Sequence, residues 1–524
     1  MTPAPTPPTL RRTSPLVTLV VGLLIGALLT AVARQPGPAE QVATAGTADR
    51  PGSGATIVRP DGEVAVDADG TPVPGVEVGD GGTGSPGGPS PVAPGGPGSP
   101  AAPDGTGGDA GPSAGPVAAA GACDAAQKPG IRGVTDTTVK IGFAVPDLGV
   151  LAALVDVGDI QGYTRSLIAA LEAEGRFPVC GRNIEPVFRT YNVLDPAESR
   201  SACVGFADQD KVFAVMALFA FSAADCVARE KGLFMFDAGQ ALTEPMYAAT
   251  PLLFAAQPPI ERQLRAYSSW VVQDGIAPGK KTGLYYVRNG PGGSAPPGEA
   301  IEKNLIAELK RLGHPIDVVV ATDGCGAYAC PDPNDNLALQ RFQSQGVEVV
   351  YMMNYKASII QRAEAQRYRP QWVLLGTAMA SDATTGDVPA QNFDGALGLL
   401  FEHVGEELAG VPPSAEEQQC FARFTSQGGR PAAKRDSAAG QSLRQVCDQV
   451  ELLARALTGA GGNLTPQTMA AGMETVRNAR MAYQATLSFV PGKHWGSSEN
   501  LVVRWHGDCA CWKAAGGFRP LFGR

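Results

Sequence analysis

Val139-Lys140-Ile141-Gly142-Phe143-Ala144-Val145 is the stretch that decides the fold class, because it is almost continuously apolar. Such a run is typical of a strand that is buried on both faces of a sheet. Apolar side chains then recur at helical spacing from Gly162 to Glu174, and Ile184 to Tyr191 is again extended. A further helix is predicted to begin at Asp195-Pro196, where Asp caps the helix and Pro fits its first turn. Alternating strands and helices predict right-handed crossovers and parallel pairing.

The same alternation continues and then restarts after a break, which predicts an α/β fold of two doubly wound parallel-sheet lobes. Further strands are predicted at 212–217, 233–236, 252–255, 282–287, 316–321, 347–352 and 373–376. Further helices are predicted at 223–231, 259–273, 298–312, 334–345, 440–458 and 466–476. Residues 485–490 and 501–505 are predicted to form a closing hairpin. In such sheets ligands bind beyond the carboxyl ends of the strands.

The N-terminal part of the chain predicts export of the folded body. Leu16 to Ala33 is apolar and follows Arg11 and Arg12, and a helix of this length spans about 27 Å of hydrocarbon. It is either an uncleaved signal anchor after a cytoplasmic tail of residues 1–15, or a signal peptide cleaved after Ala31-Val32-Ala33. Residues 34–120 are rich in Pro, Gly and Ala and are predicted to be a disordered linker. The body at 121–524 is therefore expected outside the cytoplasm.

Charge and cysteine content agree with an exported protein that does not bind nucleic acid. The chain has 524 residues and a formal net charge of -9, without the basic face that nucleic acid requires. Its 10 cysteines all follow the linker, and in an exported chain they are expected to form disulfides. Cys325 and Cys330 are close enough to staple one loop, and Cys203 and Cys226 flank a predicted strand.

The body resembles the type 1 periplasmic binding proteins, specifically the branched-chain amino acid (Leu/Ile/Val) binding family of ABC transporters. The resemblance covers about residues 134 to 524, and it rests on the order of several segments. These segments are Val139 to Gly142, Tyr191 to Ala197, Val212 to Met216, Phe236 to Gln240 and Val446 to Leu457. The resemblance implies two lobes that are joined by three hinge strands and close over a solute. It places one lobe at about 134–256 and 386–482, and the other at about 257–385 and 483–524.

The same resemblance implies a set of ligand-binding residues at the strand ends. In the family, hydroxyl and backbone donors after the third and fourth strands hold the ligand's carboxylate, which corresponds here to Ser222 and to Ala238 through Gln240. Tyr355 matches an aromatic position of the other lobe, and Asp382 is the acidic residue after the strand that ends at Gly376. Other roles are open for three of these residues. Ser222 is also placed to cap a helix, Gln240 to bond locally and Tyr355 to form an aromatic wall.

Catalytic and cofactor chemistry is not expected. No Gly-x-Ser-x-Gly nucleophile motif occurs in the folded body, so an exported hydrolase is the weakest of the functions considered. His506, Cys509 and Cys511 have a spacing that metal sites use, but the fourth ligand of a structural zinc is not visible and disulfides are favoured outside the cell. We therefore predict no enzyme, no cofactor and no metal.

Two functions remain for a body of this kind. The first is a monomeric solute-binding protein that captures a small molecule, an amino acid or a related compound, and delivers it to an ABC permease in the membrane. The second is a membrane-tethered ligand sensor or scaffold of the same fold without a transporter.

Overall fold

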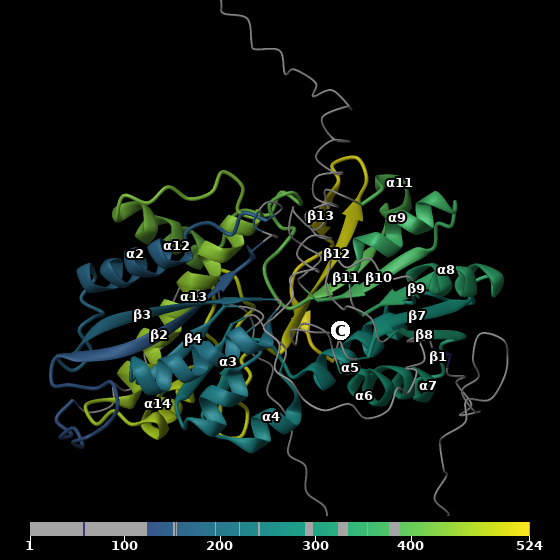
Figure 1. Ribbon diagram of the computed structural model, residues 1–524. Coiled ribbons are helices and arrows are strands. Elements are labelled where there is room, and N and C mark those ends of the chain that lie inside the picture. Colours follow the sequence, from purple (N-terminus) through teal and green to yellow (C-terminus); the bar gives the residue numbers. More distant parts are fainter. Residues whose placement is uncertain are drawn as a thin grey trace, which may run out of the picture. The chain divides into compact units, whose positions relative to one another are not determined.

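The computed structural model in Figure 1 describes most of the chain beyond Cys123. The described residues are 123–149, 152, 155–193, 195–218, 221–238, 242–288, 297–322, 334–353, 355–376 and 388–522, with the two-residue strand β1 (Thr56–Ile57). The predicted membrane segment at 16–33, nearly all of the linker at 34–120, and the pair Cys325 and Cys330 lie outside them. Within the described part the chain forms two sheets with helices on both faces, which confirms the predicted α/β fold.

The first sheet is wholly parallel and has the strand order β3-β2-β4-β5-β6. Its strands are β2 (Thr138–Asp147), β3 (Asn183–Asn192), β4 (Ala214–Ala217), β5 (Phe234–Asp237) and β6 (Leu253–Ala255). The helical segments between them are α2 (Ile160–Ala173), α3 (Pro196–Val204), η2 (Gly205–Gln209), η3 (Cys226–Glu230) and α4 (Glu244–Ala249). The predicted start of α3 is confirmed, because the Asp195 side chain accepts from the N–H of Ala197 and Pro196 is the first helical residue.

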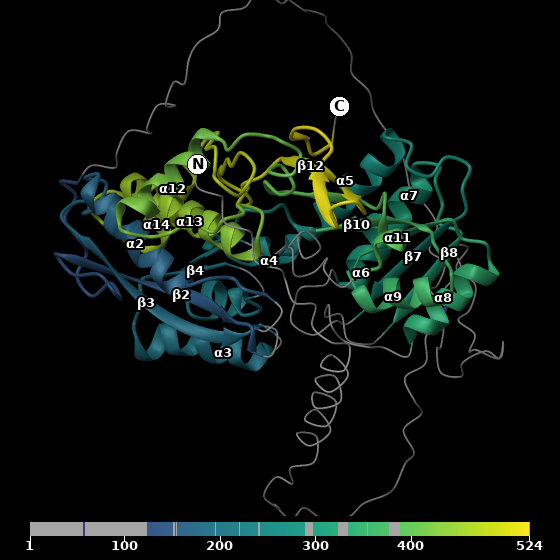
Figure 2. The ribbon, with the colours of Figure 1, turned by 90° about the horizontal axis from the view of Figure 1, so that it is seen from above.

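Helices from a much later part of the chain cover one face of this sheet. α12 (Ala415–Ser426) and α13 (Ala438–Ala460) pack beside α2, and α14 (Pro466–Met473) packs on α13 and β5. Figure 2 shows this group on one side of β2, β3 and β4, with α3 on the other side. The lobe is therefore discontinuous in sequence, since residues 282–400, which contain five strands of the second sheet, lie between its own sheet and its last three helices.

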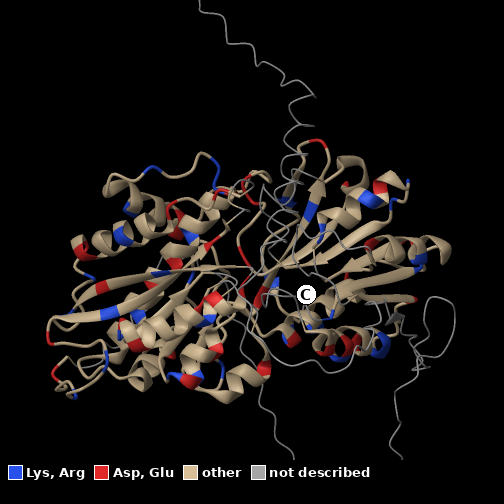
Figure 3. Cartoon of the chain, viewed as in Figure 1, with Lys and Arg blue, Asp and Glu red and all other residues tan. Residues whose placement is uncertain are grey.

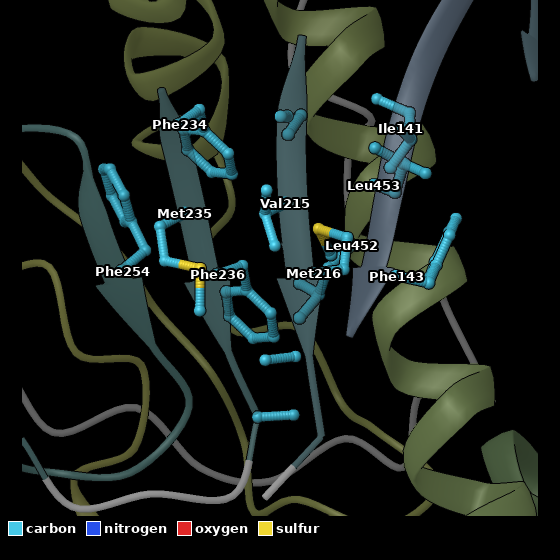
Figure 4. Packing of buried hydrophobic residues seen from close by; sticks show 14 of the residues in the cluster. Ile141, Phe143, Val215, Met216, Phe234, Met235, Phe236, Phe254, Leu452 and Leu453 are labelled. Carbon is cyan, nitrogen blue, oxygen red and sulfur yellow. The ribbon is translucent and has the colours of Figure 1, made fainter. Parts of the chain in front are cut away.

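The core of the first lobe joins α13 to the central strands. Figure 4 shows Leu452 of α13 beside the β4 side chains of Val215 and Met216, and Leu453 beside Ile141 of β2. All five side chains are fully buried. The apolar runs that predict the strands are thus buried by a helix more than 200 residues away in sequence.

The second sheet is parallel at its centre and antiparallel at its C-terminal edge. Its order is β1-β8-β7-β9-β10-β11-β12-β13, and β14 pairs with β12. The strands are β7 (Thr282–Val287), β8 (Val318–Thr322), β9 (Val349–Met352), β10 (Gln371–Leu375), β11 (Leu397–Leu400), β12 (Glu499–His506), β13 (Cys511–Ala514) and β14 (Arg519–Pro520). β11 belongs to this sheet, although the predicted boundary near 386 assigns it to the first lobe.

The predicted hairpin between 485–490 and 501–505 is wrong. β12 instead forms a hairpin with β13, where Trp505 lies opposite Trp512. Residues 485–490 contribute isolated bridges, including those of Leu487 with Ala479 and Ser497. The apolar pattern indicated extended chain correctly but not its partner, because the partner depends on tertiary packing.

Strand residues of the second sheet alternate between two separate cores, as expected for a sheet covered on both faces. Leu284 and Tyr286 of β7 face α5 (Ile260–Gln273), α6 (Gly298–Ile301), η4 (Glu302–Ile306) and α7 (Ala307–Arg311). Tyr285 and Val287 face α8 (Asn334–Ser344), α9 (Ala357–Ala365) and α11 (Ala390–Phe393). Each lobe thus has its own layered core.

Three connections link the two sheets, at 256–259, 401–414 and 474–498. The third bonds to both of the others. The N–H of Ser497 donates to the carbonyl of Ala256 at 2.8 Å, and the N–H of His403 donates to the carbonyl of Tyr483 at 2.7 Å. The connections therefore form a small hydrogen-bonded unit between the two sheets.

Disulfides and surface charge fit the expectations for an exported domain. Cys203–Cys226 is present as predicted, and Cys123–Cys180, Cys420–Cys447 and Cys509–Cys511 are also bonded. Figure 3 shows acidic and basic residues interspersed along the helices of both lobes. Among the helices that the structure describes, none has the length and hydropathy needed to cross a membrane.

Candidate functional site

The carboxyl end of β4 is held by amide side chains from α13. Gln449 donates through Nε2 to the carbonyl of Ala217, the last residue of β4, and Gln445 donates to the carbonyl of Leu218 at 3.1 Å. Gln445 and Gln449 are four residues apart, so they project from the same side of the helix. Both are buried, and they satisfy carbonyl groups at the place where the strand ends.

Asp448, between these glutamines, holds the third connection against α13. Its carboxylate accepts from the backbone N–H groups of Ala482, Tyr483 and Gln484 at 2.7, 2.9 and 2.8 Å. Burial raises the pKa of Asp448 to about 7, while the three N–H groups favour the charged form and oppose this shift. The connection between the lobes is thereby fixed to the first lobe through one carboxylate.

Gln484 extends this contact to the end of β5. Its Nε2 donates to the carbonyl of Ala238 at 2.8 Å, and its Oε1 is buried without a hydrogen-bond partner among the described residues. The N–H of Ala238 donates to the carbonyl of Ala217 at 2.9 Å. The predicted site residue Ala238 therefore lies at the strand end, with its N–H and its carbonyl both hydrogen-bonded. A carbonyl oxygen has a second lone pair and can accept a further hydrogen bond.

Ser222, the second predicted residue of this lobe, lies at the same edge and is half-buried. It directly follows Phe221, whose ring packs edge-on against Tyr191 at the end of β3, 5.0 Å between centroids. Burial raises the pKa of Tyr191 well above its ordinary value, and the charge of Asp237 at the end of β5 raises it further. The ends of β3 and β5 thus bring the ring of Tyr191 close to the Asp237 carboxylate and to Phe221, which precedes Ser222 in sequence.

The carboxyl edge of the second sheet has a different composition, built around a buried ion pair. Lys356 Nζ lies 2.8 Å from Asp335 Oδ1, and both side chains are fully buried. Tyr285 donates to the same carboxylate oxygen at 2.9 Å, and Ser358 donates to the other oxygen at 2.9 Å. Burying charges is costly unless they are paired and hydrogen-bonded, and here both conditions are met.

Tyr355, the predicted site residue of this lobe, immediately precedes Lys356. Only 7% of it is exposed, and its ring lies 6.2 Å from that of Phe393 in the core beneath α9 and α11. The described surroundings of Tyr355 are therefore those of an aromatic wall. The predicted ligand residues Gln240 and Asp382 lie outside the described residues.

A cavity of about 360 Å³ lies at the opposite edge of the second sheet. Gln371 and Leu397, which line it, are the first residues of β10 and β11, and Trp270 and Arg504 are among its other lining residues. Because ligands in parallel sheets bind at the carboxyl ends of the strands, we do not assign the solute to this cavity.

The metal pattern at the C-terminus is accounted for by a disulfide. Cys509 and Cys511 are bonded to each other, so neither sulfur is a thiolate that could join His506 in binding a metal. Among the described residues there is no group of three or more His, Cys, Asp or Glu that could hold a metal ion.

Comparison with known proteins identifies the family. Residues 138–508 match the model of a family described as periplasmic binding protein. The chain belongs to this family. As a member of it, the chain is a solute-binding protein and not an enzyme, in agreement with the prediction from sequence. A search of curated protein sequences found no match.

Solved structures show the same fold at low sequence identity. One is a fatty acid ABC transporter substrate-binding protein from Thermomonospora curvata (16% identity, 76% of this chain and 96% of that chain covered, TM-score 0.54). Another is a branched-chain amino acid ABC transporter protein from Thermus thermophilus with bound valine (13%, 74% and 98%, 0.55). A third is a solute-binding protein from R. palustris in complex with 4-hydroxybenzoate (15%, 73% and 97%, 0.54).

Sequence reasoning missed the polar side of α13 and the ion pair of Lys356. Gln445, Asp448 and Gln449 resemble the solvent face of an amphipathic helix, although they are buried. A signal was present in Lys356, which stands between the apolar pairs Met352-Met353 and Ile359-Ile360. A lysine in such surroundings is either exposed at a loop or buried with a partner.

Proposed function

We propose that this periplasmic binding protein captures a small organic carboxylate with an apolar body and delivers it to an ABC permease. The observation that carries the proposal is the carboxyl edge of the first sheet, where Gln445, Gln449 and Gln484 fix the strand-end carbonyls beside Ser222. A fixed edge presents its polar groups without a cost of ordering them when the solute binds.

The solute class is inferred from the relatives that share the fold. Their titles name valine, 4-hydroxybenzoate and fatty acid, each of which has one carboxylate and an apolar part. In this chain we assign the carboxylate to the Ser222 hydroxyl and to backbone N–H groups of the segment from Ala238 to Gln240. The N–H of Ala238 already donates to the carbonyl of Ala217, so Ala238 itself would offer only its carbonyl, which accepts from a donor such as an ammonium group. Tyr191, Phe221 and, from the other lobe, Tyr355 would form apolar walls, and Asp382 would face an ammonium group if the solute is an amino acid.

Capture follows from closure of the two lobes. A ligand that contacts groups of both lobes binds the closed form better and shifts the population toward it. In this chain Gln484 contacts the strand end at Ala238 and belongs to the connection that Asp448 anchors. A solute at Ala238 would therefore bind next to the hinge itself.

A thermal-shift panel on the full chain tests the solute class. Its arms are branched-chain amino acids, hydroxybenzoates, medium-chain fatty acids and the corresponding amides. A ligand at about 100 times its Kd adds about 2.7 kcal/mol to the free energy of unfolding, which raises the Tm measurably. We expect one class of acid to raise the Tm and its amide to be at least about tenfold weaker. If no acid raises the Tm, or acid and amide act equally, the carboxylate proposal fails.

The assignment of Ser222 is tested separately with the solute that the panel identifies. Ser222→Ala should weaken its affinity by about tenfold, since one hydrogen bond to a charged group is lost. Ser201→Ala, on an exposed position of α3, is the matched control and should leave the affinity unchanged. Equal affinities of wild type and Ser222→Ala would remove this residue from the site.

Attachment to the membrane is also part of the proposal. Residues 16–33 would hold the body at the membrane through the linker, near a permease. Fractionation of cells that express the full chain should place it with the membrane, and high salt should not release it. Recovery of a chain shortened by residues 1–33 in the soluble extracytoplasmic fraction would instead indicate a cleaved signal peptide.

A further inference from the structure

The tip of the β12–β13 hairpin carries a disulfide between Cys509 and Cys511, with one residue between them. The loop runs from Gly507 to Ala510 and leads into Cys511, the first residue of β13. The cysteine spacing is therefore unexplained by metal binding, and the solute site does not use it.

The hairpin does not depend on this disulfide. β12 and β13 are already paired from Val503 opposite Ala514 to His506 opposite Cys511. The rings of Trp505 and Trp512 are in contact, 5.6 Å between centroids, and both are buried in the core of the second lobe. The disulfide joins a loop residue to the start of the next strand and does not cross the strand pair.

A disulfide of this spacing stabilises a fold least. The stabilisation grows with the length of the loop that the bond closes, and Cys509–Cys511 has a sequence separation of 2. Cys123–Cys180 has a separation of 57. Loss of the short bond therefore costs the folded state much less than loss of the long one.

The backbone inside the ring favours opening. Ala510 has φ of 48°, in the left-handed region that is unfavourable for a residue with a Cβ. Once the bond between Cys509 and Cys511 is broken, Ala510 is free to leave this conformation.

Cys509 and Cys511 differ in solvent exposure, and this difference decides which of the two sulfur atoms an external thiolate attacks. Cys509 is exposed, whereas Cys511 is only 7% exposed. An incoming thiolate therefore reaches Cys509, and Cys511 is the leaving group.

We propose that Cys509–Cys511 is a thiol–disulfide exchange site that accepts two electrons from an external dithiol. One thiolate of the dithiol attacks Sγ of Cys509, forming a mixed disulfide, and the Cys509–Cys511 bond breaks with its electron pair on Sγ of Cys511. The second thiolate of the dithiol then attacks the other dithiol sulfur, which is bonded to Sγ of Cys509 in the mixed disulfide. This attack releases Cys509 as a thiolate. The dithiol is oxidised to a disulfide, and the protein is left with two reduced cysteines that take up protons.

Limited reduction of the full chain tests this site. The protein is treated with dithiothreitol at low concentration, quenched with an alkylating agent over a time course, and mapped by mass spectrometry. Cys123–Cys180 is the matched control, because Cys123 is also exposed. We expect Cys509 and Cys511 to be alkylated at least about tenfold faster than this control pair. Equal rates, or faster reduction of Cys123–Cys180, would overturn the proposal.

Two variants examine the cause and the independence of the site. Ala510→Gly removes the penalty of the left-handed backbone and should slow reduction by a few fold; an unchanged rate would contradict the contribution of Ala510. The double variant Cys509→Ser/Cys511→Ser should keep the Tm of the oxidised wild type to within about 2 °C, because the strand pairing remains. A large loss of Tm would show a structural disulfide and would overturn the proposal. Solute-induced shifts are measured on the same variant, so failure of exchange and failure of solute binding are distinguishable.

Discussion

The carboxyl edges of the two sheets are stabilised in opposite ways. At the first sheet, neutral amides of Gln445, Gln449 and Gln484 donate to strand-end carbonyls. At the second, the charges of Lys356 and Asp335 are paired inside the lobe. The first edge offers hydrogen-bonding groups at the place where we propose that the solute binds, whereas the second keeps its charges bonded to one another.

The two edges also differ in the sequence separation of the residues that form their hydrogen bonds. Partners at the first edge are 227, 232 and 246 residues apart in sequence. Lys356 and Asp335 are 21 residues apart, since Asp335 lies in α8 and Lys356 directly precedes α9, with β9 between the two helices. The first edge therefore exists only after the late helices have docked, while the second is complete within its own segment. Substitutions at the two edges should reflect this difference.

Removing the lysine of the second edge should have the largest effect. Lys356→Met leaves Asp335 as a buried charge without its ion-pair partner, and we expect the free energy of unfolding to fall by about 3–5 kcal/mol, measured by urea denaturation. Lys303→Met is the matched control, because its ion pair with Glu299 is exposed and screened by solvent, so its loss should leave the free energy of unfolding nearly unchanged. The double variant Lys356→Met/Asp335→Leu should recover part of the loss. A single variant as stable as the control would show that the pair is not buried as described.

At the first edge, the largest effect is expected from Asp448. Asp448→Ala leaves three buried N–H groups of residues 482–484 without an acceptor, which should cost about 3 kcal/mol in urea denaturation. Asp156→Ala is the control, since Asp156 is exposed and accepts from one N–H group, that of Gly158. If both variants lose the same stability, the connection is not anchored through Asp448.

The order of the elements could be predicted from the sequence because each buried strand is itself a continuous apolar run, which is a local pattern. β2, β7 and β9 are confirmed close to their predicted bounds for this reason. The polar contacts at the strand ends could not be predicted, because Gln445 and Gln449 donate to carbonyl groups in a distant part of the chain. Local sequence carries no information on a partner more than 200 residues away.

The same limit applies to the site and to the C-terminal strands. Ser222 and Ala238 lie at the predicted edge because a strand end is a local feature. The pairing of β12 with β13 was missed, since the apolar pattern at 485–490 does not state which strand it faces.

A pH series separates Asp448 from the ion pairs of the same helix. Burial raises the pKa of Asp448 to about 7, so the folded state favours its protonated form. This contribution to stability is present below about pH 4 and is lost as the pH rises toward 7. Burial acts on Glu451 in the same direction, but its bonds with Arg176 and Arg455 lower its pKa to about 2. Its contribution is present above about pH 4.5 and is lost as the pH falls toward 2.

The expected result is a difference in slope between two variants. The wild-type stability should decline between about pH 4 and 7, measured by urea denaturation at each pH, and Asp448→Asn should remove the part of this decline that Asp448 causes. Glu451→Gln should leave that range unchanged and should remove the decline below about pH 4.5. A decline between pH 4 and 7 that persists in Asp448→Asn would assign it to another group.

The smallest effect is expected from the amide side chains that donate to the strand-end carbonyl groups of the first edge. Gln445→Leu leaves the carbonyl of Leu218 without its donor, and a lost hydrogen bond of this kind costs about 1 kcal/mol. Gln441→Leu is a control on the same helix, because its Nε2 donates to the carbonyl of Asp436, its Oε1 accepts from the Tyr483 hydroxyl, and neither partner is a strand end. Gln441→Leu should lose at least as much stability as Gln445→Leu, but only Gln445→Leu should weaken binding of the solute found by thermal shift. Equal loss of affinity in both would mean that α13 contributes to binding through its packing and not through the strand-end carbonyl, and the contrast between the two edges would then concern stability alone.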